Sequence, residues 1–189
     1  GARCYAYDER SLSHFGRLQY DYKGKYLLSA MIRRDLSTKF GPSNRVAYFP
    51  SFTAGWVISD ESFFPESKSV NFLKLRGSYG TLGNDQIKSN AYISLLGGEA
   101  TYIFNGQLVN GNAIGLLANP DVKWEEARKF DVGLDFRLFN NKVEIATDYF
   151  IDTRKDLLIV NVPISAITGI AAPGASSPVI NAGSVRNKG

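Results

Sequence analysis

Acid–base chemistry in this 189-residue chain would have to come from four carboxylates near its middle, Glu125, Glu126, Asp131 and Asp135. Two well-placed carboxyl groups are what glycoside hydrolysis requires. Asp131 and Asp135, however, alternate with apolar residues, so the simpler interpretation is that they pair with cations on one face of a strand. His14, the single histidine, does not lie in a sequence motif of the kind that supplies the His of a Ser-His-Asp catalytic triad. The sequence therefore predicts no catalytic residue and no enzymatic activity.

Other ligand sites have little support. Cys4 is the only cysteine, so neither an internal disulfide nor a Cys/His metal site is expected. The Gly-containing stretches 80–85 and 41–45 lack the Lys-Ser/Thr pair and the following helix of a phosphate-binding loop, and they predict turns. The 22 basic and 18 acidic residues give a net charge of +4 and are intermixed, which argues against nucleic-acid binding. No cofactor or metal is expected.

A period of two in hydrophobicity organises the chain around residues 33–56. On both sides of a polar loop at 34–46, one set of alternate residues is apolar and aromatic, and the other is small, polar or cationic. The same alternation predicts strands at 11–22, 25–33, 48–58, 72–80, 129–138 and 143–152. Pro50 lies inside one of these strands and predicts a bulge or bend there.

The turns predict the register of two hairpins. Asn140 and Asn141 tolerate positive φ, and a turn there places Arg137 opposite Glu144 on one face and Phe136 opposite Ile145 on the other. A three-residue loop at 22–24 is expected to pair Tyr20 with Tyr26. Residues 81–122 are expected to form a long connection with a possible small hairpin. After Asp156 we expect a strand that is followed by a long loop.

These features favour an all-β fold, an antiparallel meander that forms part of a large transmembrane β-barrel. No apolar run approaches the roughly 18 residues of a membrane-spanning helix, so contact with lipid would be made by strands. Barrels of the transporter type have about 22 strands around a plugged lumen, whereas this chain has about six to eight. We therefore expect residues 1–189 to be a partial barrel segment, with the plug domain, the signal peptide and the remaining strands absent.

Long blocks of the sequence resemble the SusC/RagA-like TonB-linked outer-membrane transporters. The main block is RRDLSTKFGPSNRVAYFPSFTAGWVISDESFF at 33–64. It is followed in the same order by LKLRGSYGTLGND, NPDVKWEEARKFDVGLDFRLFNN, DYFIDTRKDLL and NAGSVRNKG. Leu36 departs from the family pattern, which usually has Gly there, and this concerns the tightness of the expected turn.

The resemblance implies a function for the parent protein in the bacterial outer membrane. It would import oligosaccharides or peptides with energy supplied by TonB, with a SusD-like lipoprotein as a lid and the lipid bilayer around the barrel. This segment would supply wall, lumen lining and extracellular loops. The alternatives are a passive porin-like barrel segment and a soluble β-sandwich carbohydrate-binding module.

Two sets of residues follow from the alternation. The residues expected to face the lumen are Arg33, Lys74, Arg76, Asp131, Asp135, Arg137, Glu144 and Asp148. Aromatic residues expected on strand ends at the membrane interface are Tyr20, Tyr26, Tyr48, Trp56, Tyr79 and Tyr149.

Overall fold

The computed structural model describes residues 9–65, 69–160, 162–163, 165 and 176–189. Its elements are β1 (Ser11–Tyr22), β2 (Tyr26–Ser37), η1 (Pro42–Asn44), β3 (Val46–Val57), η2 (Ile58–Asp60), β4 (Val70–Asn84), β5 (Leu95–Phe104), β6 (Gln107–Leu116), β7 (Glu125–Leu138), β8 (Val143–Lys155), β9 (Leu158–Ile159), β10 (Ile180–Asn181) and β11 (Ser184–Lys188).

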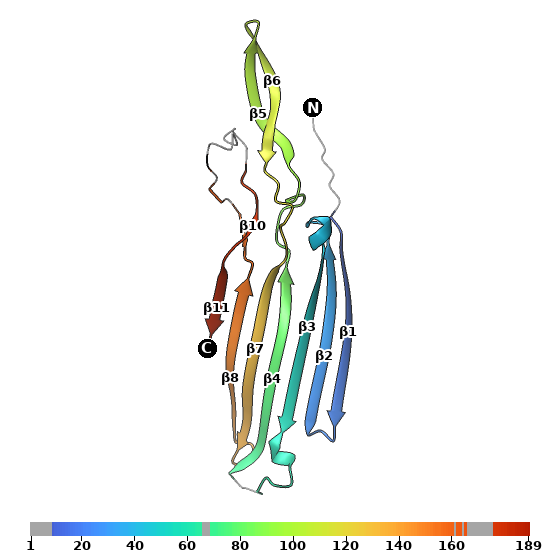
Figure 1. The fold of residues 1–189 in the computed structure, drawn as a ribbon. Helices are drawn as coiled ribbons and strands as arrows, with labels where there is room; N and C mark the ends of the chain where they lie inside the picture. The colour runs from blue at the N-terminus through green and yellow to red at the C-terminus, as the bar shows by residue number, and fades with distance from the viewer. Residues whose placement is uncertain (1–8, 66–68, 161, 164, 166–175) are drawn as a thin grey trace.

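One antiparallel sheet of seven strands, in the order β1-β2-β3-β4-β7-β8-β11, makes up most of the molecule (Figure 1). The β5–β6 hairpin is inserted between β4 and β7 and extends beyond the end of that sheet, which confirms the small hairpin expected in the long connection. Strands β2 and β4 run further than expected, to Ser37 and Asn84. In the part of the chain that the structure describes, no helix is long and apolar enough to cross a membrane.

The β7–β8 hairpin has the predicted register. Leu138 pairs with Val143, and Arg137 pairs with Glu144. Asn140 and Asn141 have φ values of 57° and 62°, as a type I′ turn requires at both central positions. Local turn chemistry was therefore sufficient to determine this register.

The expected pairing of the first hairpin was wrong by two residues. Tyr20 pairs with Leu28, and the loop consists of Lys23, Gly24 and Lys25. Lys23 and Gly24 both adopt positive φ, and the Gly24 amide donates a 2.7 Å hydrogen bond to the Asp21 carboxylate. This side-chain bond holds the turn one residue later than expected. Because the shift is an even number, the two faces keep their predicted composition.

The expected turn at Leu36 and bulge at Pro50 are corrected as well. Leu36 lies within β2 and pairs with Val46, so the turn begins only after Ser37. Pro50 pairs with Ile32 without a register shift. Pro50 has no backbone N–H to donate to β4 on its other side, and the β3–β4 pairing accordingly stops at Ser51. There the Thr81 hydroxyl donates a hydrogen bond to the Pro50 carbonyl.

The C-terminal region also differs from the expectation. Within the described residues, the apolar run after Asp156 contributes the two-residue β9, which pairs with β10. The last strand of the sheet is instead β11, which pairs with β8 and was expected to be loop. Its pairing partner lies about thirty residues earlier in the sequence, so alternation within these few residues gave little signal.

The connections differ in length at the two ends of the sheet (Figure 1). The turn end carries the connections at 23–25, 58–69 and 139–142, and the loop end carries those at 38–45 and 85–124 and the link from β8 to β11. Outer-membrane barrels place short turns on the periplasmic side and long loops outside. The two longest connections, at 85–124 and from β8 to β11, are at the loop end, as that rule predicts, although the turn-end connection at 58–69 is longer than the loop-end one at 38–45.

Candidate functional site

The sheet has one apolar face and one charged face. Because pairing from β2 to β8 is regular across the strand centres, residues that alternate along each strand stay on a common side. The register places all of the following sequence-predicted residues on the charged face: Arg33, Lys74, Arg76, Asp131, Asp135, Arg137, Glu144 and Asp148.

Arg76 is at the centre of this face, among three carboxylates from two neighbouring strands. Its Nη2 lies 2.6 Å from Asp148 Oδ1, its Nε lies 3.2 Å from Asp135 Oδ1, and its Nη1 lies 3.7 Å from Asp131 Oδ1. The four side chains are each about one-third exposed. A guanidinium with donors in a fixed fork suits this arrangement, in which different nitrogens meet different carboxylates.

Gly133 makes the space for this cluster. It pairs with Arg76 on one side and with Asp148 on the other, so it lies directly beneath their contact. A Cβ at this position would lie 2.5 Å from Asp148 Oδ1 and 2.7 Å from Arg76 Cζ. The glycine therefore leaves the space in which the Arg76 side chain crosses over the backbone of β7 to reach Asp148.

Charge pairing extends along the rest of the face. Arg137 Nε lies 3.3 Å from Glu144 Oε1, and its guanidinium lies over the ring of Phe72. Lys129 and Asp152 form a longer pair of 3.8 Å. Lys74 makes no ion pair with any residue that the structure describes. The face is thus polar and mixed in sign, with one lysine available to a solute or a partner.

The aromatic residues lie on the apolar face, but not all at strand ends. Tyr26 and Trp56 stack at the turn end, with ring centroids 6.3 Å apart, whereas Tyr48 is near the loop end. Tyr79 and Tyr149 are in the middle of their strands, which corrects the expectation that they lie at strand ends. The position of these two side chains along the sheet depends on how β4 and β8 align with the neighbouring strands, which the sequence of a single strand does not reveal.

A hub at the turn end joins β2, β3 and η2. Glu61 accepts hydrogen bonds from the Tyr26 hydroxyl, from Trp56 Nε1 at 3.1 Å and from Lys25 Nζ at 3.4 Å. These donors, with Tyr26 first in importance, lower the pKa of Glu61 below its ordinary value. Ionised Glu61 therefore fixes the connection between the third and fourth strands.

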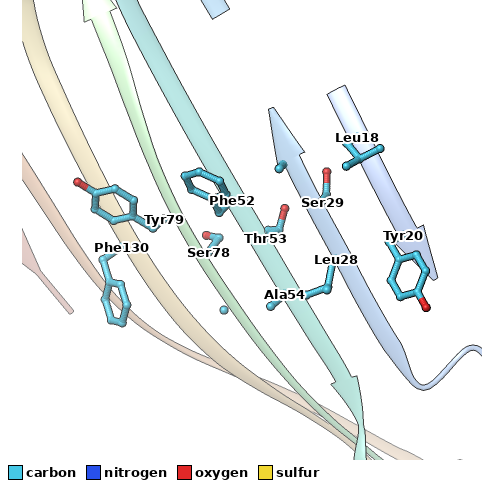
Figure 2. Close-up of a pocket in the computed structure, with 12 residues that line it drawn as sticks. Leu18, Tyr20, Leu28, Ser29, Phe52, Thr53, Ala54, Ser78, Tyr79 and Phe130 are labelled. Atoms are coloured by element: carbon cyan, nitrogen blue, oxygen red, sulfur yellow. The ribbon is translucent and has the colours of Figure 1, made fainter. Parts of the chain in front are cut away.

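The apolar face contains a shallow hollow of about 560 Å³ (Figure 2). Small residues at Ala30, Ala54 and Gly77 form its floor. Larger side chains surround them, namely Leu18, Tyr20, Leu28, Phe52, Tyr79 and Phe130. The face is therefore not a flat surface but has a groove bordered by aliphatic and aromatic groups.

A compact core at the loop end was not predicted. Phe40 and Val122 are fully buried, and Trp124 packs on Phe40 with a centroid distance of 5.0 Å. Polar bonds hold the same region: Asn119 Nδ2 donates to the Val179 carbonyl at 2.7 Å, and Asn181 exchanges two 2.8 Å bonds with Lys123. These residues come from three segments that are far apart in the sequence, so no local periodicity reveals them.

The sequence did contain one unused signal in this region. Asn105 and Gly106 have φ values of 52° and 74° and connect β5 to β6 in a tight turn. An Asn-Gly pair between alternating residues is a strong hairpin signal. The hairpin exposes a set of large apolar side chains: Tyr102, Ile103, Phe104, Leu108 and Val109.

Among the described residues, no group of three or more His, Cys, Asp or Glu side chains is arranged to hold a metal ion. The Arg76 carboxylates instead surround a fixed cation. This arrangement can solvate and orient a polar solute or an opposing protein surface. It contains no nucleophile beside a base.

Comparison with known proteins agrees with this geometry. Residues 3–189 match the family model described as "TonB dependent receptor-like, beta-barrel". TonB-dependent receptor P3 of Formosa agariphila is 36% identical over 98% of this chain and 18% of its own length, and SusC of Bacteroides thetaiotaomicron is 32% identical over 85% and 16%. A structure of the RagAB peptide importer in the "open-open" state superposes with a TM-score of 0.79 at 31% identity, covering 95% of this chain and 19% of that one.

The chain thus spans less than a fifth of the length of these relatives. Its single-layer antiparallel sheet, with one apolar and one charged face, is the architecture expected of such a barrel wall. The match extends over nearly all of its residues. On these grounds the chain belongs to the TonB-dependent receptor β-barrel family.

Proposed function

We propose that this chain forms part of the wall of an outer-membrane importer, with its apolar face toward lipid and its charged face toward the lumen. The observation that carries the proposal is the separation of the two faces across seven strands in continuous register. Leu18, Phe52 and Ile145 are exposed on one side, while the Arg76 cluster occupies the other. In water the apolar side would have no cover, whereas in a bilayer it meets hydrocarbon.

The soluble β-sandwich alternative requires a second sheet packed on the apolar face. Among the described residues, the two additional sheets are the small β5–β6 and β9–β10 pairs. The large hydrophobic side chains of the apolar face remain exposed, including Leu18 at 73%. The open apolar face therefore supports the barrel proposal over the sandwich.

For the whole protein, we infer import of oligosaccharides or peptides that is energised by TonB. Similarity to SusC and to the RagAB peptide importer supports this substrate range. The contribution of this chain is lumen lining: the mixed charges around Arg76 would keep a polar path hydrated or contact a plug domain. No catalytic step is assigned to it.

A SusD-like lipoprotein is the proposed partner at the loop end. The β5–β6 hairpin extends beyond the sheet and exposes Tyr102, Phe104 and Leu108 there (Figure 1). Aromatic residues of this kind are enriched in protein interfaces. The hairpin is therefore the element of this chain that we expect to contact the lid.

Uptake in intact cells tests the energised mechanism. The full-length protein would be expressed in otherwise identical strains with and without TonB, and accumulation of labelled peptides and oligosaccharides would be measured. Uptake that requires TonB is expected. Equal uptake in both strains would show passive, porin-like passage, and a protein absent from the outer membrane would contradict the proposal altogether.

A further inference from the structure

Four basic residues gather on the apolar face at the loop end, where β7, β8 and β11 lie side by side. We call Arg128, Lys155, Arg186 and Lys188 the basic patch. Thr153 pairs with Arg128 on one side and with Arg186 on the other. Lys155 is two residues further along β8, and Lys188 is two residues further along β11 in the opposite direction. All four basic residues are exposed.

The charges of this patch are largely uncompensated. Arg128 forms a two-pronged pair with Glu126, at 2.8 and 3.2 Å. Lys155, Arg186 and Lys188 make no ion pair with a residue that the structure describes.

Carboxylates near the patch have other partners. Asp156 pairs with Lys123 at 3.1 Å. Asp152 is paired with Lys129 on the charged face. Glu125 is buried and accepts a hydrogen bond from the Leu158 amide. The patch therefore keeps a net positive charge.

Directly below the patch the same face becomes apolar. Lys188 pairs with Ile151, which pairs with Phe130. Phe130 and its neighbour Tyr79 form one border of the 560 Å³ hollow, which continues across β3 and β2 to Leu18 (Figure 2). A surface with cations at one end and an aliphatic groove beneath them matches an amphiphile with an anionic head.

We propose that the basic patch and the hollow bind a phosphate-bearing lipid of the outer leaflet. The inference rests on the proposed function, because the membrane orientation places the loop end outside. In that orientation the cations lie at head-group depth, where basic residues on the lipid face cost little, and the hollow lies at acyl-chain depth. Arg186 beside the Thr153 hydroxyl supplies the forked donors that phosphate oxygens accept, and Lys155 and Lys188 add two further positive charges.

Lipid binding to the full-length protein in detergent, followed by native mass spectrometry, tests the proposal. The probes are bisphosphorylated lipid A, the same lipid with its phosphates removed, and inorganic phosphate as a competitor. The double variant Lys155→Gln/Arg186→Gln is compared with Lys23→Gln/Lys142→Gln, which removes the same charge at the turn end. Arg186→Lys keeps the charge, and heat-dependent gel mobility confirms that each barrel is folded.

The patch variant is expected to bind phosphorylated lipid A about tenfold more weakly, since each basic residue near the surface contributes appreciably to anionic-lipid binding. The turn-end variant should stay within about twofold of the wild type, and Arg186→Lys, which keeps the charge and loses the fork, should bind with an affinity between those of the wild type and the patch variant. Equal binding of the patch and turn-end variants would overturn the proposal, and so would equal binding of dephosphorylated lipid. Displacement by inorganic phosphate would assign the site to free phosphate instead.

The outcome is separable from that of the proposed function. If the protein resides in the outer membrane and imports in a TonB-dependent way, but the patch variant binds lipid A normally, only the lipid site is wrong. If the protein is not in the outer membrane, both proposals are wrong.

Discussion

At the residue scale, Gly133 shows how a missing side chain determines a charged cluster. Arg76 crosses over β7 at this glycine to reach Asp148, and both lie within 2.8 Å of where a Cβ would be. The atoms in the way are the ends of flexible side chains, so a larger residue would displace the ion pair more than the backbone. The cluster therefore depends on a residue that carries no charge.

Gly133→Ala in the full-length protein is expected to destabilise the barrel by about 1 kcal/mol, because the added methyl group separates Arg76 from Asp148. Gly77→Ala is the matched control, since the nearest atom to its Cβ is 3.8 Å away. Urea unfolding in detergent measures both, and the control should stay within about 0.5 kcal/mol of the wild type. Equal effects of the two substitutions would contradict the role of Gly133.

Glu61 predicts a pH dependence at the turn end. Its lowered pKa means that the ionised form is favoured in the folded state, so its stabilising effect is complete above the ordinary glutamate pKa and is lost as pH falls through the lower, folded value. The protection of residues 56–61 from hydrogen exchange, corrected for the intrinsic pH dependence of amide exchange, is expected to fall below about pH 4.

Glu61→Gln should remove most of this dependence while raising exchange at neutral pH. Glu144→Gln is a suitable control, since Glu144 pairs with Arg137 on a different hairpin. If the corrected protection of residues 56–61 did not depend on pH in the wild type, the contacts at Glu61 would not be held by its carboxylate.

At the scale of elements, the β5–β6 hairpin is independent of the main sheet in its pairing. Its turn depends on Gly106 at φ 74°. Gly106→Ala is expected to cost about 1–2 kcal/mol locally, because an L-residue resists this conformation. Gly111→Ala is the control, because its Cβ would make only ordinary contact, 3.5 Å from the Ala100 carbonyl oxygen.

Hydrogen exchange measures the outcome. Protection should fall in β5 and β6 of the Gly106 variant and stay unchanged in β4 and β7. A loss that spread into the main sheet would mean that the hairpin supports the barrel wall rather than standing apart from it.

At the scale of the whole molecule, two consecutive residues test which face meets lipid. Phe52 is on the apolar face and Thr53 on the charged face, and both are exposed. In a bilayer, Phe52→Arg is expected to cost about 2–4 kcal/mol, whereas Thr53→Arg should cost little because it faces water. Folding of the full-length protein into vesicles at several urea concentrations gives both values. A larger penalty for Thr53→Arg would reverse the assignment of the faces.

The sequence by itself determined the features that depend on near neighbours. A period of two identified most of the wall strands and both faces, since successive side chains of a strand point to opposite sides. Asn140 and Asn141 determined the β7–β8 register through their tolerance of positive φ. The register of the first hairpin could not be predicted in this way, because the hydrogen bond from Gly24 to Asp21 moved the pairing by two residues. The composition of the two faces did not change.

Only the tertiary structure decided which strands lie together across long insertions. Strand β7 pairs with β4 although some forty residues separate them, and this pairing brings Asp131 and Asp135 to Arg76. The placement of β11 beside β8 and the burial of Phe40 with Trp124 have the same origin. Such contacts join segments that are far apart in the sequence, and the local pattern of one segment does not identify its partner. Their geometry follows from the closure of loops and the packing of the complete sheet.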